Sequence, residues 1–549
     1  MARLGYRKLL PHEVLEMSKL LKLFFFGLLL SSLQLVRAQS VTAASCNTSA
    51  VQTAINTATE GQTVYIPSGT CTWTGGVTIS GKGINLQGAG SGRIVAYDNG
   101  NAMETVGTGS RTWTIAGFSP GFTGSILTGT LTAYALGDEA LSMTGTVTSY
   151  SGSTLTMNIT STTGSGSYHR WFFSTPSSTV LINNSGTAMF SVTEDTSFDT
   201  RLSGFKIQAG TGAGDGVDFK YASGGQAIVL QNCWIQQGSG DSTRFSTNGG
   251  VISNCSFDSP TFSMAPEAVH VKIDSPSSGQ ITWTQPSYWG AADTTGQNNI
   301  YVETSDFEAY LNAFDDDDNG RLVWRYNLMN NTGSGTHGAD TSNYGVRYFE
   351  YYKNTGVFNG YNDGSTFNMN WWLFVRGGTF VVWGNTMAAL TSTDYGTRPD
   401  VNMTAMNLQR NGGPNACWGA GGGATGTNYH IPRQVGVGRV TGTGTANYPT
   451  GKVNNSSTDS ITYVGDSEPA YIWGNTRQPL SNITISNYGG SDCSNPDVSG
   501  NYIQANRDYF NGSTAKPGYT AYTYPHPLAG GGTTTNAPLP PINLKAVAN

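Results

Sequence analysis

Short apolar or aromatic stretches recur along the chain, and each leads to a polar residue followed by a small or apolar one. Seven of these stretches can be aligned: VLQNCWI (229–235), VISNCSF (251–257), VETSDF (302–307), VWRYNLM (323–329), YYKNTGVF (351–358), VVWGNTM (381–387) and YIWGNTR (471–477). The polar position is Ser305 in the third stretch and Asn in the other six. Alternating apolar positions within each stretch predict short β-strands with one buried face.

The spacing of these polar positions predicts stacked coils. Asn232 and Asn254 lie 22 residues apart, as do Ser305 and Asn327, and Asn354 follows Asn327 after 27 residues. Repeats of this length predict a parallel β-helix, in which strands of successive coils lie about 4.8 Å apart and a residue type recurs as an internal ladder. A β-sandwich is the alternative fold with many short strands, but it does not predict a recurring Asn at coil spacing.

The segment SCNTSAVQTAINTATEGQTVYIPSGTCTWTGGVTISGKGINLQGAG (45–90) begins with an amphipathic stretch that carries Val51, Ile55 and Ala58 on one face. Strands are expected at 63–66, 77–79 and 84–87. Through "AIN", "GQTVYIPSGTC" and "INLQGAG", the segment resembles the capped start of right-handed parallel β-helix proteins of the pectate-lyase-like superfamily. The resemblance covers residues 45–95 closely and 180–530 more loosely. It implies an all-β, right-handed, single-stranded parallel β-helix of about a dozen or more coils.

The expected organisation has further parts around this solenoid. Residues 39–104 would form the N-terminal cap and first coils, and residues 176–528 the body with a C-terminal cover. Between them, residues 105–175 interrupt the coil rhythm and predict a small inserted β-domain of hairpins, with SYSGSTLTM as a strand-turn-strand. This insert resembles modules of phage tail and secreted surface proteins. Tyr and Pro residues of GYTAYTYPHPL (518–528) are expected to cover the open end of the solenoid, and residues 529–549 to be a flexible Gly, Thr and Pro-rich tail.

Composition agrees with an all-β chain. Of 549 residues, 72 are Gly and only 12% are charged, whereas about a quarter is usual. Gly costs roughly 1 kcal/mol per helical position relative to Ala, so this composition disfavours helices.

The N-terminus predicts export. From Met17, the run MSKLLKLFFFGLLLSSLQLVRAQS has basic residues, a short apolar core and a small-residue exit before Gln39, as in a secretory signal peptide (1–38). Residues 1–16 are interpreted as an upstream extension of the reading frame, and a genuine N-terminal segment is the alternative. The apolar run is too short for a membrane span, which needs about 20 residues. We therefore expect a secreted, extracellular or periplasmic, bacterial protein.

Charge and cysteine content narrow the function classes. Without residues 1–38 the net charge is −10, against −6 for the whole chain. An acidic chain without basic runs is a poor candidate for nucleic-acid binding. Six cysteines in an exported chain predict disulfides, and their order suggests Cys46–Cys71, Cys233–Cys255 and Cys417–Cys493.

Candidate chemistry gathers between residues 303 and 376. Glu303 and Arg325 each precede a ladder position by two residues, so they should stack on neighbouring coils and face the same way. Their opposite charges fit either a structural ion pair or a substrate-binding pair. Glu350 precedes Asn354 by four residues, which places it on the same face.

The segments FDDDDNGRLVWRYN, THGAD, RYFEYYKNT and VRGGTFVVWGNT resemble a recurring set in secreted bacterial β-helix proteins. From them we expect one patch. Its catalytic candidates are His337, Asp340, Arg347, Glu350 and Arg376. Its substrate-binding candidates are Glu303, Arg325, Tyr344 and Trp372. The last two are included because aromatic faces stack on sugar rings.

A polysaccharide lyase and a glycoside hydrolase could both use such a patch. A lyase neutralises a uronate carboxylate and removes the C5 proton with a base, and Arg325, Arg376, His337 and Tyr344 could fill these roles. Calcium could bind the carboxylates of Asp315, Asp316 and Asp318, although four adjacent Asp residues in a turn are more often solvated surface. A hydrolase needs two carboxylates, which Asp315, Asp340 and Glu350 could supply.

The expected function is therefore a secreted carbohydrate-active enzyme that cleaves an extracellular polysaccharide. The family resemblance favours β-elimination over hydrolysis, although the characteristic motifs of pectate lyases and of β-helix polygalacturonases are absent. A non-catalytic glycan-binding surface or adhesion protein is the alternative, and a purely structural fibre component is the third.

Overall fold

Nearly all of the regular secondary structure in the described part of the chain is β-strand. The computed structural model describes residues 40–100, 102–135, 138–259, 267–273, 279–281, 285, 292–317, 319–336, 346–358, 361–362, 365–366, 371–375, 377–389, 404–409, 435–441, 464–478, 485–488 and 505–530. These ranges hold one α-helix, α2 (Thr48–Thr57), and the short 3₁₀ helices η1 (Gly124–Ile126) and η2 (Pro527–Gly530). The predicted signal peptide lies outside them. Within them, no helix has the length and apolar character needed to span a bilayer.

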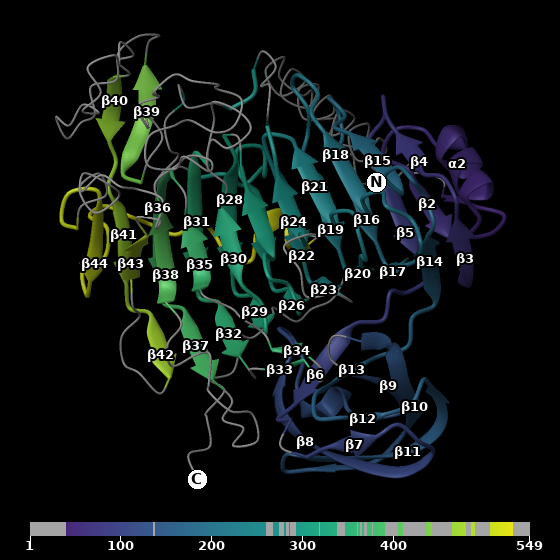
Figure 1. The fold of residues 1–549 in the computed structure, drawn as a ribbon. Helices are drawn as coiled ribbons and strands as arrows, with labels where there is room; N and C mark the ends of the chain where they lie inside the picture. The colour runs from purple at the N-terminus through teal and green to yellow at the C-terminus, as the bar shows by residue number, and fades with distance from the viewer. Residues whose placement is uncertain are drawn as a thin grey trace, which may run out of the picture.

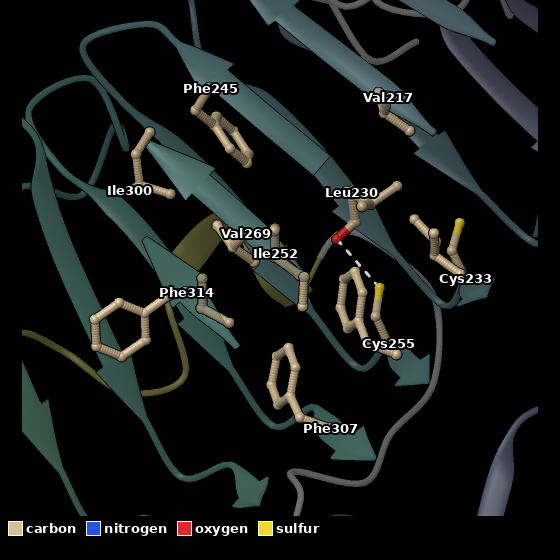
Figure 2. Packing of buried hydrophobic residues seen from close by; sticks show 14 of the residues in the cluster. Val217, Leu230, Cys233, Phe245, Ile252, Cys255, Val269, Ile300, Phe307 and Phe314 are labelled. Carbon is tan, nitrogen blue, oxygen red and sulfur yellow. Dashed lines mark hydrogen bonds between the residues drawn. The ribbon is translucent and has the colours of Figure 1, made fainter. Parts of the chain in front are cut away.

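The chain folds as a parallel β-helix (Figure 1). In the described part of the chain, ten coils each place one strand in each of three parallel sheets, here named A, B and C. Sheet A gains one further strand at each end. Apolar side chains of all three sheets fill the interior of the solenoid as one core (Figure 2).

The strands of the three sheets follow in spatial order. Sheet A consists of β1 (Val41–Thr42), β2 (Thr63–Ile66), β5 (Asn85–Gly88), β16 (Thr200–Ser203), β19 (Ile228–Gln231), β22 (Gly250–Ser253), β25 (Ile300–Glu303), β28 (Arg321–Arg325), β31 (Tyr348–Tyr352), β36 (Thr379–Trp383), β41 (Ala470–Trp473) and β44 (Tyr509–Gly512). Sheet B consists of β3 (Gly69–Trp73), β14 (Thr179–Asn183), β17 (Lys206–Ala209), β20 (Trp234–Gln236), β23 (Ser256–Asp258), β26 (Asp306–Glu308), β29 (Leu328–Asn330), β32 (Thr355–Phe358), β37 (Thr386–Ala389) and β42 (Thr476–Gln478). Sheet C consists of β4 (Val77–Ile79), β15 (Phe190–Thr193), β18 (Val217–Lys220), β21 (Thr243–Ser246), β24 (Val269–Val271), β27 (Phe314–Asp316), β30 (Ser334–Thr336), β35 (Trp371–Val375), β38 (Thr404–Gln409) and β43 (Ile485–Tyr488).

A ladder of asparagines lines the corner between sheets A and B. The N–H of Asn327 donates to Oδ1 of Asn354 at 3.0 Å, and the N–H of Asn354 donates to Oδ1 of Asn385 at 2.9 Å. The N–H of Asn385 donates in turn to Oδ1 of Asn475 at 3.1 Å, and Ser305 donates to Asn327 at 3.0 Å. The predicted ladder is confirmed over these five positions. Its side chains satisfy backbone groups that the corner removes from the sheets.

Asn232 and Asn254 do not belong to this ladder. Strand register pairs Ser253 with Glu303, which aligns Asn254 with Thr304 and Cys255 with the ladder residue Ser305. Asn232 and Asn254 instead occupy the corner position one residue earlier, with φ of 51° and 54°. The alignment of the seven stretches on their polar residue is therefore shifted by one residue in the stretches that contain Asn232 and Asn254.

The predicted Cys233–Cys255 disulfide is wrong, because both residues are free thiols in the core. Each sulfur also lies near a backbone carbonyl oxygen. Cys233 Sγ lies 3.4 Å from the carbonyl oxygen of Gln231, and Cys255 Sγ lies 3.7 Å from that of Leu230 (Figure 2). The predicted Cys417–Cys493 bridge lies outside the described residues.

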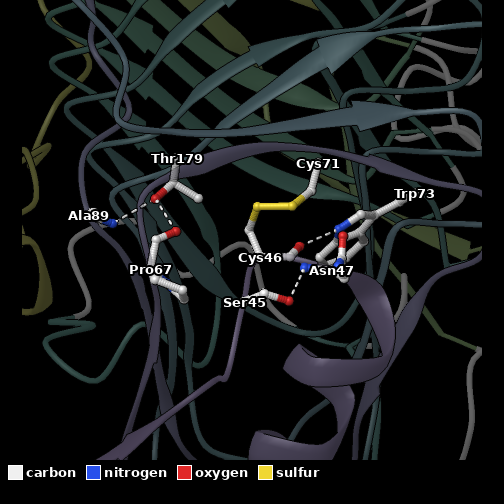
Figure 3. The surroundings of a disulfide bond; sticks show 8 residues. All are labelled: Ser45, Cys46, Asn47, Pro67, Cys71, Trp73, Ala89 and Thr179. Carbon is white, nitrogen blue, oxygen red and sulfur yellow. Dashed lines mark hydrogen bonds between the residues drawn. A yellow bond between two sulfur atoms is a disulfide. The ribbon is translucent and has the colours of Figure 1, made fainter.

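The N-terminal end of the solenoid is closed by α2, which buries Val51, Ile55 and neighbouring Ala54 against the first coils. The predicted Cys46–Cys71 disulfide is confirmed, and it ties the segment before α2 to β3 (Figure 3). Trp73, fully buried, donates from Nε1 to the carbonyl oxygen of Cys46 at 2.8 Å. The cap is therefore covalently and sterically fixed to the first coil.

A closed six-stranded antiparallel barrel is inserted between β5 and β14 (Figure 1). It consists of β6 (Ile94–Asp98), β8 (Gly109–Phe118), β9 (Thr130–Ala135), β10 (Asp138–Ser151), β11 (Thr154–Thr163) and β13 (Trp171–Ser174). Its root docks on sheet B, where Arg93 forms a buried 3.0 Å ion pair with Asp306 and the ring of Tyr134 meets Trp234 edge-on at 5.7 Å. Three small antiparallel pairs complete the described strands: β7 (Glu104–Thr105) with β12 (Ser167–Tyr168), β33 (Tyr361–Asn362) with β34 (Ser365–Thr366), and β39 (Val437–Thr441) with β40 (Val464–Ser467).

Residues 516–530, here called the C-terminal strap, lie along the outer face of sheet A. The expectation was that they would cover the open end of the solenoid. Instead, the ring of Tyr519 contacts Trp473 of β41, Tyr524 stacks on Tyr326 just after β28, and Arg201 of β16 donates to the carbonyl oxygen of Leu528 at 2.8 Å. The strap therefore runs back across most of the coils toward the N-terminal end.

Candidate functional site

The residues selected from the sequence between 303 and 376 do not form an open patch. Glu303, Arg325, Arg347, Glu350 and Trp372 all have exposed fractions of 0%. The C-terminal strap covers Glu303, Arg325 and Glu350, and Trp372 points into the solenoid. Arg347 is instead covered by Gln285 and Glu468.

The Glu303–Arg325 pair is a structural ion pair beneath the strap. Arg325 Nε donates to Oε2 of Glu303 at 2.8 Å. The remaining guanidinium nitrogens donate to the hydroxyl of Tyr352 and to the carbonyl oxygens of Tyr522 and Thr523, at 2.8 to 2.9 Å. With every guanidinium nitrogen bonded, Arg325 anchors the strap, and the structural interpretation of this pair is the one that the contacts support.

Arg347 and Trp372 are held by the scaffold as well. Arg347 Nη2 donates to the carbonyl oxygen of Gln285 at 3.1 Å and lies 3.4 Å from a carboxylate oxygen of Glu468. Trp372 packs inside the core, edge-on to Tyr351 at 5.1 Å. Its ring faces are therefore occupied by other side chains and not directed to a groove.

The acidic run is split by strand alternation. Asp315 and Asp316 are adjacent in β27, so their side chains leave opposite faces of sheet C, and Asp316 is fully buried. Asp317 pairs with Lys272 at 3.6 Å. The described part of the run therefore does not bring Asp315 and Asp316 to one calcium ion. His337, Asp340, Tyr344, Arg376 and Asp318 lie outside the described residues.

A different cluster emerges on the outer face of sheet C. Asp241, Glu267 and His270 each offer one ligand or proton-transfer atom, and these atoms all lie within 4.8 Å of one another. Asp241 and Glu267 each lie two residues before a strand, β21 and β24, on neighbouring coils. His270 lies in β24 and is paired in register with Arg244 of β21. Asp241 and His270 keep side-chain exposures of 14% and 15%, so this cluster is reachable from solvent in a way that Glu303 and Glu350 are not.

The backbone fixes the carboxylates of this cluster in a column. Oδ1 of Asp215 accepts the N–H of Asp241 at 3.0 Å, and Oδ1 of Asp241 accepts the N–H of Glu267 at 3.5 Å. Oδ2 of Asp241 lies 2.8 Å from Nδ1 of His270. Three carboxylates thus occupy equivalent positions on three successive coils, and the middle one is paired with an imidazole.

The pKa values of the cluster diverge. Burial, together with the hydrogen bond and negative charge of Asp241, raises the pKa of Glu267 to about 10. Burial alone would raise the pKa of Asp241, but hydrogen bonds from His270 and Glu267 outweigh it and lower the value to about 2. Burial lowers the pKa of His270, yet its hydrogen bond to Asp241 and the charge of that carboxylate leave the pKa raised. At neutral pH a protonated carboxyl therefore stands beside an ionised one.

This donor set suits some metals and not others. Two carboxylates and an imidazole are typical ligands of zinc or manganese, whereas calcium prefers six to eight oxygen ligands. Asp241, Glu267 and His270 would hold such a transition metal after Glu267 lost its proton. They do not fit calcium.

A repeated sequence pattern could have located this cluster. The segments DGVD (215–218), DSTR (241–244), EAVH (267–270) and NAFD (312–315) each place a polar residue three positions before a second polar residue. The residue just before the second polar one is buried, and it is Val, Thr, Val and Phe in turn. Asp215, Asp241 and Glu267 recur at an interval of 26 residues. The alignment on Asn used a different corner of the coil and passed over these segments.

No protein-family model and no curated protein sequence matches the chain. Two solved structures that match part of the chain are phage tailspikes. For tailspike gp61 of Pseudomonas phage phi297 the identity is 14%, the TM-score 0.15, and the match covers 66% of this chain and 72% of that chain. For tailspike gp49 of Pseudomonas phage LKA1 the identity is 11%, the TM-score 0.15, and the coverages are 64% and 67%. At a TM-score of 0.15 neither likeness supports a conclusion about this chain.

Proposed function

We propose that the protein is a secreted carbohydrate-active enzyme of the pectate-lyase-like superfamily that cleaves an extracellular polysaccharide at the outer face of sheet C. The observation that carries the proposal is the pair of adjacent carboxyl groups, Asp241 and Glu267, whose pKa values are displaced in opposite directions. Pairs of this kind separate the acid from the anion in enzymes that cleave glycosidic bonds.

Hydrolysis assigns a role to each group. Glu267 donates its proton to the glycosidic oxygen as the bond to the anomeric carbon breaks, and a water molecule supplies the new hydroxyl. Ionised Asp241 stabilises the positive charge that develops on the sugar ring. His270 keeps Asp241 ionised through the 2.8 Å contact. The carboxylate of Asp215, one coil further, accepts the N–H of Asp241 and would take up a proton from the attacking water.

β-Elimination on a uronate is the second candidate, and it is favoured by Arg244. The register places Arg244 between Asp218 and His270 in one outward row. A guanidinium beside a charged imidazole is a suitable cation for a uronate carboxylate. The family resemblance also favours this reaction. Calcium dependence stays a prediction, with no ligand set for it among the described residues.

The test combines a substrate panel with variants of the cluster. Purified protein is incubated with acidic and neutral polysaccharides, with calcium, zinc or EDTA, while reducing ends and the ultraviolet absorbance of unsaturated products are measured. Reducing ends alone indicate hydrolysis, and both signals indicate elimination. Glu267→Gln should lower kcat about 10²- to 10⁴-fold with unchanged folding. Asp241→Asn should move the alkaline limb of the pH profile to lower pH, because Glu267 loses the negative neighbour that raises its pKa.

Lys220→Gln is the matched control on the same face. Its ammonium lies 3.4 Å from Asp218 and is half exposed, so activity should stay within about twofold of wild type. If the Glu267→Gln variant cleaves the substrate as fast as wild type, the active site lies elsewhere in the protein. Glycan binding without any cleavage would instead establish the non-catalytic binding protein.

A further inference from the structure

The C-terminal strap is held at its two ends by ionisable groups. At the β31 end, the carboxyl of Glu350 is fully buried and accepts hydrogen bonds from the hydroxyls of Tyr348 and Tyr519, the latter at 2.5 Å. Tyr519 belongs to the strap, and its hydroxyl also accepts a hydrogen bond from Nε1 of Trp383 at 3.2 Å. A neutral carboxyl suits this position, because an ionised one would be buried without an ion-pair contact among the described residues.

The groups that face Glu350 explain why its proton is retained. Burial raises the pKa of Glu350 to about 7, although the two tyrosine hydrogen bonds and the charge of Arg325 act in the opposite direction. The ionisable groups that face this carboxyl come from β28, β31 and the strap: Arg325, Tyr348, Tyr352, Tyr519 and Tyr522. Detaching the strap would expose the carboxyl and return its pKa toward the ordinary value of 4.5.

The other end of the strap depends on a neutral imidazole. Nε2 of His526 donates to the carbonyl oxygen of Asp293 at 2.8 Å, and Nδ1 accepts the N–H of Leu528 at 3.2 Å. The N–H of His526 donates to Oε1 of Glu303 at 2.8 Å, and its ring packs 4.5 Å from that of Tyr301. Protonation of Nδ1 would remove the acceptor for Leu528.

Burial lowers the pKa of His526, against the contrary effect of its hydrogen bond to Asp293. The charged groups that face the ring come from β25, β28, the segment before β25 and the loop before β16: Glu303, Arg325, Asp293 and Asp199. The docked strap therefore favours neutral His526.

From these contacts we propose that the strap is a two-ended latch whose docking is balanced against pH, with Glu350 securing one end in its protonated form and His526 securing the other in its neutral form. The two dependences have opposite signs. Docking weakens as pH rises from about 4.5 to about 7, because Glu350 ionises more readily once the strap is detached. Docking also weakens as pH falls below 6.5, because detached His526 takes up a proton that the docked imidazole does not. Below pH 6.5 the two effects oppose each other.

Hydrogen exchange followed by mass spectrometry tests the latch on the full chain. Protection factors of peptides from residues 516–530, corrected for intrinsic exchange, are measured from pH 4.5 to 8. Protection of the wild-type strap should change less with pH between pH 5 and 6.5 than protection in either single variant. Glu350→Gln should show protection that increases with pH, and His526→Gln protection that decreases with pH, each by up to about tenfold per pH unit as expected for one linked proton.

The core peptide 228–236 reports folding of the solenoid in every variant. If Glu350→Gln perturbs that peptide, Tyr519→Phe provides the same test from the strap side, because it removes a donor to Glu350 without changing the solenoid. It should weaken strap protection and extend the decrease of protection with pH to higher pH, because loss of the Tyr519 hydrogen bond raises the pKa of docked Glu350 further. Variants whose pH profiles follow wild type within twofold would overturn the latch, as would a wild-type strap that is unprotected at every pH.

Discussion

At the residue scale, the corner between sheets A and B separates two neighbouring positions with different requirements. The first, or corner, position has a left-handed backbone, and at exposed Lys353 the φ angle is 57°. In the next two coils this position is occupied by Gly384 and Gly474. The following position points inward and is Asn354, 1% exposed. Backbone geometry constrains the first position and hydrogen bonding the second.

Replacing Asn354 with Ala should therefore lower the free energy of unfolding by about 2–5 kcal/mol. The variant leaves the N–H of Asn327 and the carbonyl oxygen of Trp324 buried without their present partners. Chemical denaturation monitored by circular dichroism measures the change. Lys353→Gly is the adjacent control, because relief of the left-handed backbone offsets loss of the Lys353–Trp383 contact and should keep stability within about 1 kcal/mol of wild type. Equal losses in the two variants would refute the ladder argument.

At the element scale, the strap decides what the outer face of sheet A can do. Val229, Val251, Tyr301, Val323 and Tyr352 form an apolar row on that face, and Tyr522 with parts of Leu528 and Ala529 covers it. Glu303 and Arg325 lie within this covered strip, where they hold a distant segment in place.

Arg325→Met should lower the free energy of unfolding by about 3–5 kcal/mol, because it leaves the buried carboxylate of Glu303 without its cation. The double variant Glu303→Gln/Arg325→Met should recover part of that loss. Urea titrations of the single and double variants provide the measurement. Lys220→Met, which breaks a half-exposed pair, is the control and should change stability by less than about 1 kcal/mol. A double variant less stable than Arg325→Met would contradict this account.

At the scale of the whole molecule, the barrel is joined to the solenoid by buried polar contacts. Arg93 Nη2 bonds to Asp306 at 3.0 Å and to the carbonyl oxygen of Cys255 at 3.3 Å, and the hydroxyl of Tyr97 donates to Asp306 at 3.3 Å. Ile94 and Phe172 at the base of the barrel belong to the solenoid core, although the interior of the barrel forms a second core. We therefore expect the barrel and the solenoid to unfold together.

Arg93→Met should divide this single transition in two, because Asp306 would remain buried opposite a thioether. Differential scanning calorimetry would then show an early transition for the barrel. Arg111→Met removes a partly exposed 3.7 Å pair with Glu104 within the insert and should leave one transition. Two transitions already present in wild type would show that the docking contacts do not couple the parts.

The sequence by itself determined the repeating part of this protein. Alternating apolar residues at coil spacing predicted the parallel β-helix, the amphipathic stretch at Val51 and Ile55 predicted the cap, and Cys46 and Cys71 predicted the bridge. These features depend on contacts within one coil or between neighbouring coils. Short-range periodicity is sufficient to specify them.

Only the tertiary structure decided which outward side chains meet solvent. Glu303 and Arg325 have the sequence pattern of a surface pair, but a strap about 200 residues later buries them. Asp241 and Glu267 have the same kind of pattern and remain partly exposed. The alternation of residues along a strand predicts which side chains point out of the solenoid. It does not predict which segment covers that face, because the covering segment is distant in sequence and is placed by packing.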